Sequence, residues 1–344
     1  DKASSSIIQK SLEKHEGKYP IYGASGLIKY VDFYQREKPY IAVVKDGAGI
    51  GRVMKLPAYS SVIGTMQYII PNEKVDINYL VYSMEYMNLA KYFSGATIPH
   101  IYFRDYQKEP LNLPEIKVQK KIGGILSNIE KLIAFRNQEL SKFDQLVKSR
   151  FIELFGDPVS NDKFWNLAIL QDVTSKIGSG ATPKGGKSSY QKEGIPFIRS
   201  MNVHDGVFLS KDLAYLSDKQ AKQLENVIVK ENDVLLNITG ASVARSCIVP
   251  KTVIPARVNQ HVSIIRCIPK YLNPEFLNKL FLHHRYKNLL LSLGEAGGAT
   301  RQAITKSQLE KLQIILPPLT LQNEFADFVQ QVDKSKYGEI LNAL

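Results

Sequence analysis

The chain has 344 residues, 44% of them apolar, with a net charge of +12, a pI of about 9.4 and two cysteines. This composition excludes a disordered chain and a disulfide framework, and the short apolar runs exclude a membrane-spanning helix. Residues 1–156 carry 22 basic and 16 acidic side chains and residues 157–344 carry 23 and 17, so each part has a net charge of +6. We therefore expect two folded domains with a polyanionic partner, in a reducing cytoplasm.

The first segment, residues 1–113, has the pattern of a mixed α/β domain. Strands are predicted at Tyr40–Lys45 and Tyr68–Ile70, followed by a short helix at Asn78–Tyr92. Because the chain begins with Asp rather than Met, and lacks a counterpart of a later segment around Trp165–Val173, we expect this domain to be incomplete at its N-terminus.

A long helix is predicted next, within residues 114–156. From Val118 to Phe155 there is no proline, and apolar residues recur at spacings of three and four. Pro114 suits the start of a helix and Gly156 its end. Roughly 38 helical residues would span about 57 Å, a length typical of a coiled-coil spacer. The side chains expected to pack against another helix are Ile122, Ile125, Ile129, Ile133, Leu140, Phe143 and Val147.

The second mixed segment, residues 157–316, repeats this order of elements. Its predicted strands are Ile195–Arg199, Asp233–Ile238, Ser246–Val249 and His261–Cys267, and a helix capped by Asn273 is predicted over Pro274–Leu293. A second spacer helix, residues 317–344, follows with Phe325, Phe328 and Val332 at its packing positions. It is shorter than the first, so we expect it to be truncated.

An internal repeat links the two segments. Residues 94–101 and 113–119 match residues 297–304 and 316–322 at a constant offset of 203, which pairs Thr97 with Thr300 and Gln119 with Gln322. The strand at 40–47 matches 233–240 at an offset of 193, so loops of different length separate the matched blocks. Two copies of one scaffold with diverged loops are the expected architecture, in the α+β class.

Catalytic motifs are only approximated. Gly47-Ala-Gly49-Ile-Gly51 departs from the dinucleotide fingerprint, because its third glycine comes one place early and Pro57 opposes a following helix. Residues 179–188 depart from the P-loop, because Ala181 stands where that motif needs glycine. The six histidines show no metal-ligand spacing. We predict no catalytic residue and no metal site.

Polar and glycine-rich loops remain as candidates for nucleic-acid binding, because they allow close approach to phosphates and hydrogen bonds to base edges. In the first half the candidates are Tyr22, Ser25, Lys45, Arg52, Gln67, Thr97 and His100. In the second half they are Thr182, Lys184, Lys187, Arg199, Asn202, Thr239, Arg245, Gln260, His261, Thr300, Arg301 and Gln302. We expect Arg301→Ala to weaken discrimination at one half of a DNA site.

In combination these stretches resemble the specificity subunit of a type I restriction–modification system. The resemblance is carried by residues 19–26, Ile195–Arg199, Asp233–Ser242, Val258–Val262 and Thr300–Gln302, and by the helix ends Phe151–Pro158 and Phe325–Lys336. It implies two target recognition domains that each read half of a split DNA sequence, and two spacer helices that pair antiparallel. It also implies two methyltransferase subunits and a restriction subunit as partners, which supply S-adenosylmethionine, ATP and Mg chemistry that this chain lacks.

Two other functions are compatible with the residues. The chain would be a stand-alone DNA-modifying enzyme if it methylated or cut DNA alone. It would be a helical protein-interaction scaffold if it bound no DNA even at low salt with its partner present. A salt-dependent gel shift separates these readings, because each neutralised phosphate releases counterions.

Overall fold

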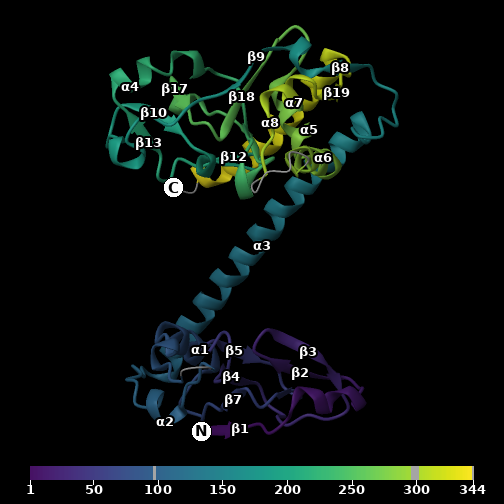
Figure 1. Cartoon of the computed structure of the whole chain (residues 1–344). Helices are drawn as coiled ribbons and strands as arrows, with labels where there is room; N and C mark the ends of the chain where they lie inside the picture. Colours follow the sequence, from purple (N-terminus) through teal and green to yellow (C-terminus); the bar gives the residue numbers. More distant parts are fainter. Residues whose placement is uncertain (96–97, 296–301, 343–344) are drawn as a thin grey trace. The chain divides into compact units, whose positions relative to one another are not determined.

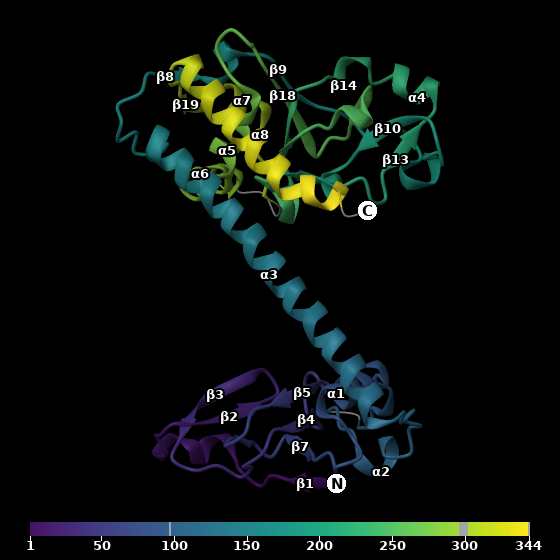
Figure 2. The ribbon, with the colours of Figure 1, turned by 180° about the vertical axis from the view of Figure 1, so that it is seen from behind.

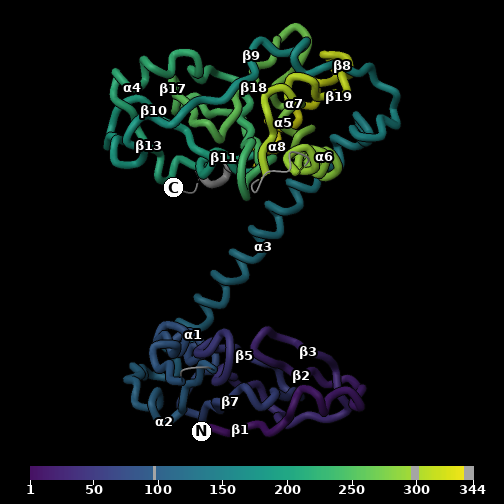
Figure 3. The backbone as a smooth tube through the Cα atoms, in the orientation of Figure 1, coloured from purple at the N-terminus to yellow at the C-terminus, as the bar shows by residue number. Residues whose placement is uncertain are grey.

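The computed structural model describes residues 1–95, 98–295 and 302–342. The chain forms two compact units, unit 1 (Asp1–Gln138) and unit 2 (Glu139–Leu344), and each is described by itself. Their boundary falls inside the helix α3 (Ile116–Phe155) rather than at its ends. Figure 1 and the tube in Figure 3 follow the chain in colour through these units. No helix in the described part is long and apolar enough to cross a membrane.

The predicted central helix is confirmed. α3 has 40 residues and begins two residues before the predicted Val118. It ends at Phe155 and is followed by Gly156, whose φ of +70° is the left-handed conformation that glycine adopts readily. The Gly156 N–H donates to the Ile152 carbonyl at 2.8 Å. The sequence therefore locates this end correctly.

Unit 1 is built on two sheets. The first has the order β1-β7-β4-β5 and the second has the order β3-β2-β6. Leu80 and Val81 of α1 (Ile77–Tyr86) pack on Ile41 and Val53 of the first sheet. The strands are β1 (Lys2–Ser4), β2 (Tyr19–Gly23), β3 (Gly26–Val31), β4 (Tyr40–Val44), β5 (Val53–Leu56), β6 (Ser61–Val62) and β7 (Met66–Ile69).

Unit 2 repeats this topology. Its first sheet has the order β16-β15-β18-β9, which corresponds strand for strand to β5-β4-β7-β1, and its second sheet has the order β13-β10-β17-β14. In both second sheets two strands pair in parallel, β2 with β6 and β10 with β17. The strands are β9 (Thr174–Ser179), β10 (Ile195–Ile198), β13 (Ala214–Leu216), β14 (Ile228–Val229), β15 (Val234–Asn237), β16 (Ser246–Ile248), β17 (Ala256–Val258) and β18 (Val262–Cys267).

Shorter elements complete the fold. Two further strand pairs lie in unit 2, β11 (Val203–His204) with β12 (Val207–Phe208) and β8 (Leu167–Ile169) with β19 (Gln313–Ile315). The short α-helices are α2 (Phe103–Tyr106), α4 (Asp218–Lys222) and α7 (Lys306–Glu310), and 3₁₀ turns include η2 (Leu89–Tyr92).

The helix predicted over Pro274–Leu293 is two helices. α5 (Pro274–Leu282) and α6 (His284–Glu295) are separated by His283, whose φ of −61° and ψ of +130° are extended. The His283 ring stacks on Phe151 of α3 at 5.8 Å, and that packing accompanies the break. Asn273 caps α5 as predicted, because its side chain accepts from the N–H groups of Glu275 and Phe276.

The last helix, α8 (Leu319–Asn342), packs antiparallel to the end of α3 inside unit 2. Arg150 pairs with Glu324 at 2.7 Å and Lys336 with Asp144 at 2.6 Å, so the two helices run in opposite directions. Figure 2 shows α8 beside α5 in the same unit. The predicted packing residues Val147, Phe325 and Val332 are buried in this core, and Phe143 and Phe328 pack against it. Leu140 is half-buried beside it.

Four other predicted packing residues lie on the part of α3 that belongs to unit 1. Ile122, Ile125, Ile129 and Ile133 are 36–56% exposed. Their role in helix packing stays a prediction.

Candidate nucleic-acid interface

Each unit carries one turn that connects corresponding strands of its first sheet. Residues 45–52, the first turn, join β4 to β5, and residues 238–245, the second turn, join β15 to β16. Gly51 N–H donates to the Val44 carbonyl at 2.8 Å, and Ala244 N–H donates to the Asn237 carbonyl at 2.9 Å. The two turns therefore have the same backbone closure.

A segment later in each unit, the bracing segment (residues 99–101 in unit 1 and 302–304 in unit 2), forms main-chain hydrogen bonds with the turn in the same way. In unit 1 Ile101 N–H donates to Lys45 and Gly47 N–H to Pro99, both at 2.9 Å. In unit 2 Ile304 N–H donates to Ile238 at 2.8 Å and Gly240 N–H to Gln302 at 2.9 Å. Arg52 and Arg245 consequently occupy matching positions, each at the end of its turn.

The second turn brings four predicted residues into one hydrogen-bonded chain. The Thr182 hydroxyl donates to the Gln260 amide oxygen, and Gln260 Nε2 lies 3.1 Å from His261 Nε2. His261 Nδ1 in turn contacts the Thr239 hydroxyl. If Gln260 donates, the His261 proton resides on Nδ1 and the Thr239 O–H points its own hydrogen elsewhere. In this order the hydroxyl hydrogen of the half-buried Thr239 is available to donate to a bound group.

That chain borders an open hollow of about 480 Å³. Three predicted residues, Thr239, Arg245 and His261, line it. The other lining residues are mainly small or polar: Ser200, Met201, Gly240, Ala241 and Ser242. A cation beside hydroxyl and imidazole groups suits hydrogen bonds to phosphates or to base edges.

The remaining candidates of unit 2 lie around this region with less organisation. Arg199 lies over the Tyr190 ring at 5.6 Å and donates to the Asp212 carbonyl. Gln302 donates to Glu295 at 2.8 Å. Lys184 and Lys187 are exposed on the loop before β10.

In unit 1 the candidates also surround the turn. The exposed Arg52 donates to the Ala24 carbonyl at 2.7 Å, which ties the turn to the β2–β3 hairpin that holds Tyr22 and Ser25. Burial raises the pKa of the Tyr22 hydroxyl, and Tyr30 raises it further, so this group stays a neutral hydrogen-bond donor. The surface around the first turn can therefore both attract and donate to an anion.

One acidic group also faces this turn. The carboxylate of Asp46 contacts His100 Nδ1 and lies 3.8 Å from Lys45 Nζ. The acid lowers the local positive charge and orients the His100 ring, which packs on Tyr102 at 4.1 Å.

Two predicted residues do not belong to the interface. Gln67 is 5% exposed, and its amide oxygen accepts from the Tyr106 hydroxyl at 3.4 Å. Asn202 is 0% exposed and braces its own loop, because it accepts from Arg199 N–H at 3.0 Å and donates to the Leu209 carbonyl at 2.9 Å. Both were expected at the surface and are buried instead, because Gln67 lies within the buried strand β7 and Asn202 is held inside its own loop. Thr97, Thr300 and Arg301 lie outside the described residues.

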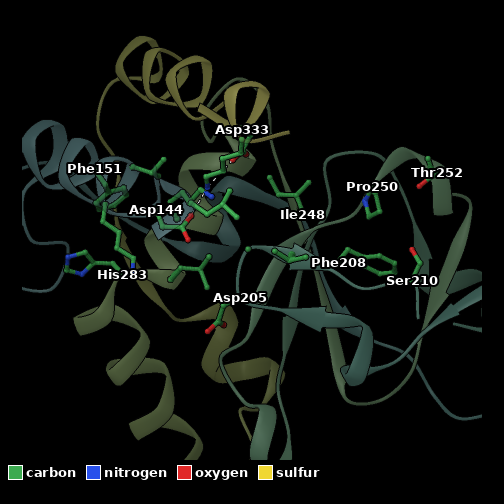
Figure 4. A pocket seen from close by; sticks show the side chains of 18 residues that line it. Asp144, Phe151, Asp205, Phe208, Ser210, Ile248, Pro250, Thr252, His283 and Asp333 are labelled. Atoms are coloured by element: carbon green, nitrogen blue, oxygen red, sulfur yellow. Dashed lines mark hydrogen bonds and ion pairs between the residues drawn. The ribbon is translucent and has the colours of Figure 1, made fainter. Parts of the chain in front are cut away.

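A separate pocket of about 760 Å³ lies in unit 2 between the end of α3, α5, α8 and β12. Figure 4 shows Asp144 and Asp333 on its helical side and Phe208 and Pro250 opposite. Lys336 pairs with both of these carboxylates, at 2.6 and 3.4 Å. Asp205, which lines the pocket between β11 and β12, pairs with Lys287. These charges join elements of unit 2 to one another, so we assign the pocket no ligand.

Comparison with known proteins agrees with this architecture. A family model, "Type I restriction modification DNA specificity domain", matches residues 2–143 and 163–344. The type I restriction enzyme MjaVIII specificity subunit of Methanocaldococcus jannaschii is 23% identical over 349 residues, which cover 93% of this chain and 80% of that protein. The MjaIX specificity subunit of the same organism is 22% identical over 294 residues, which cover 76% of this chain and 63% of that protein.

A solved structure shares the fold. The crystal structure of the type I restriction-modification system S subunit from M. genitalium aligns with a TM-score of 0.70 at 14% identity, over 100% of this chain and 90% of that one. The predicted α+β class is thereby confirmed. The match of the family model along both halves shows that the chain belongs to the type I restriction modification DNA specificity domain family.

Proposed function

We propose that this chain is the non-catalytic specificity subunit of a type I restriction–modification complex and reads a bipartite DNA target. The observation that carries the proposal is the repeated turn, in which one backbone frame presents Arg52 in unit 1 and Arg245 in unit 2. Two copies of one frame with different side chains suit two half-sites of different sequence. The net charge of +6 on each half supplies the sequence-independent attraction to phosphates.

We propose the division of labour that the resemblance to type I specificity subunits implies. Two methyltransferase subunits would dock on this chain and supply S-adenosylmethionine binding and adenine methylation. A restriction subunit would add ATP- and Mg-dependent cleavage. This chain would then contribute the choice of sequence and the distance between its two halves.

The decisive experiment is sequencing of methylated sites in cells that carry the chain together with its methyltransferase subunits. We expect a split motif, with two short specified parts separated by a fixed number of unspecified base pairs. Cells that carry the methyltransferase alone are the control. Methylation of a single continuous motif, or of the same motif without this chain, would contradict the proposal.

A gel shift of the purified complex separates the alternatives. We expect binding to fall steeply between about 50 and 200 mM salt, as it does for proteins that neutralise several phosphates. Absence of binding at the lower salt would favour a protein-interaction scaffold. Methyl transfer by the isolated chain would favour a stand-alone enzyme.

A further inference from the structure

Two buried glutamines make the same three hydrogen bonds in the two units. Gln119 on the first turn of α3 accepts from Asp76 N–H at 3.0 Å and donates to the Lys74 and Pro114 carbonyls at 3.0 and 2.7 Å. Its side chain is 1% exposed. Because both N–H groups and the amide oxygen are used, the side chain has one orientation.

Gln322 on the first turn of α8 repeats this arrangement. It accepts from Asn273 N–H at 2.9 Å and donates to the Tyr271 and Pro317 carbonyls at 3.2 and 2.8 Å. It is 0% exposed. Both glutamines therefore join the start of a long helix to the N-cap residue of a helix that packs on the first sheet.

Each N-cap residue begins a helix that packs against the first sheet of its unit, and this helix connects the glutamine to the sheet. Asp76 caps α1 by accepting from Asn78 and Tyr79 N–H, both at 3.0 Å, and Asn273 caps α5 in the same way. Leu80 and Met84 of α1 pack on Val43 of β4, which leads into the first turn. Phe276 and Leu280 of α5 pack in one core with Leu236 of β15, which leads into the second turn.

Packing at Gly123 gives an independent sign that α3 and α1 are held closely. A Cβ at Gly123, one turn beyond Gln119, would lie 2.8 Å from Tyr79 N and 2.9 Å from Asn78 Cβ. The matching position in α8 at the offset of 203 is Ala326. Only the unit 1 junction therefore requires glycine at this site.

We propose that Gln119 and Gln322 are positioning residues, each of which fixes the angle between a long helix and the DNA-reading turn of its unit. The inference rests on the proposed function for the role of the turns, whereas the fixed angle is a property of the chain itself. A buried amide with three partners resists rotation of the helix, because any tilt leaves polar groups unsatisfied away from water. Each recognition turn is thus held at a set angle before DNA binds.

The angle is measured in the full chain with pairs of spin labels. One pair is placed at the exposed positions Tyr86 of α1 and Asn128 of α3, and the other at Asn288 of α6 and Asp327 of α8, each replaced by cysteine. The native Cys247 and Cys267 are buried, and burial raises the pKa of each thiol to about 12, so neither takes up label.

We expect Gln119→Met, which keeps the volume and removes all three bonds, to broaden the unit 1 distance distribution by about twofold and to leave the unit 2 distribution unchanged. Gln322→Met should do the converse. Gln138→Met and Gln330→Met, at exposed positions of the same helices, are the controls. Gly123→Ala leaves the glutamine in place but puts a Cβ against the main chain of α1, so it should shift the mean unit 1 distance and leave the unit 2 distribution unchanged.

The consequence for recognition is measured separately, on the complex with its methyltransferase subunits. We expect complexes that carry Gln119→Met or Gln322→Met also to methylate sites whose spacer is one base pair longer or shorter. Their discrimination between the correct and the altered spacer should be about tenfold weaker than that of the parent, while the affinity for an isolated half-site is unchanged. A merely destabilised unit would lose half-site affinity instead.

Unchanged distance distributions in both Gln→Met variants, or equal broadening by the surface controls, would overturn the positioning role. If the parent complex recognises no split site, the proposed function fails, and the spin-label distances still decide whether the glutamines fix the helices.

Discussion

Unit 1 and unit 2 share a backbone frame and differ in the side chains that this frame carries. The strands of their first sheets are in the same order, the turns close with matching hydrogen bonds, and a buried glutamine joins each unit to a long helix. In the first turn an acidic residue, Asp46, pairs with His100 of the bracing segment. In the second turn Thr239 takes that place and contacts His261. The main-chain hydrogen bonds are thus the same in the two units, while the side chains differ.

The differences in chain length between the two units also lie outside this shared backbone frame. The offset between matched residues is 193 at the turn, 197 at the helix cap and 203 at the bracing segment. Part of this added length is α6, which stands where the described part of unit 1 has the short turn η2. Loop length therefore changes beside the recognition turns without changing how the turns are held.

The largest expected effect comes from shortening α3. Deletion of the exposed residues Lys131–Ala134 removes about 6 Å and adds a rotation of about 40° beyond a full turn. We expect methylation of the parental site to be lost and a site with a shorter spacer to be gained, because both recognition turns remain intact. Methylome sequencing checks this, and replacement of Lys131, Leu132 and Ile133 by alanine, which keeps the length of the helix, is the control. Retention of the parental spacer would contradict a ruler role for α3.

Truncation of a unit 2 core residue should destabilise one unit only. Phe325 of α8 is fully buried, with its ring 5.5 Å from Phe151 and 5.4 Å from Phe155. We expect Phe325→Ala to lower the free energy of unfolding of unit 2 by about 3–5 kcal/mol. Hydrogen exchange measured by mass spectrometry should show faster exchange in unit 2 peptides and unchanged exchange before residue 116. Phe164→Ala, at a 91% exposed position, is the control.

Removal of one recognition arginine should affect one half-site only. We expect Arg245→Ala to weaken discrimination at one half of the target by about 1–3 kcal/mol and Arg52→Ala to do so at the other half. Competition binding with DNA mutated in each half measures both. Equally weakened binding to all sequences would identify the arginine as a phosphate contact. An effect of both variants on the same half of the target would contradict the assignment of one half-site to each unit.

The sequence predicted the elements that local patterns determine. Periodicity located α3 to within two residues, the Gly156 stop was correct, and Asn273 was identified as a cap. The constant offset of 203 also matched Gln119 with Gln322 before their shared role was visible. These features depend on residues close together along the chain, which a single sequence displays.

Features that depend on tertiary partners were missed. Gln67 and Asn202 are polar and adjacent to turns, yet both are buried. The distant Tyr106 hydroxyl donates to the Gln67 amide oxygen, and the Asn202 amide donates to the Leu209 carbonyl of its own loop. The break at His283 accompanies the packing of its ring on Phe151, which is far away in sequence. The role of Gln119 was hidden for the same reason, because its partners Lys74 and Asp76 precede it by more than 40 residues.

The smallest expected effect concerns the segment that follows the C-terminal end of α3 within unit 2. Burial raises the pKa of Asp157, but hydrogen bonds from Val159 N–H at 2.8 Å and Ser160 N–H at 3.3 Å, with the ion pair to Arg285, outweigh it and lower the pKa overall. A carboxyl whose pKa is lower in the folded state stabilises that state above its unfolded value of about 4. That stabilisation is lost as the pH falls through the folded pKa.

We therefore expect Asp157→Asn to lower the free energy of unfolding of unit 2 by about 1 kcal/mol at pH 7, and the deficit to shrink as the pH falls below about 4, because the parent then begins to lose its ionised carboxylate. Trp165 is the only tryptophan, and its indole donates to the Phe155 carbonyl at 3.0 Å, so its fluorescence during urea unfolding reports on this junction. Asp32→Asn is the matched control in unit 1, because the pKa of Asp32 is lowered by its hydrogen bond to His15 while the side chain remains exposed. A deficit for Asp157→Asn that is equally large at pH 3 would show that the lost side-chain geometry, and not the charge, stabilises the junction.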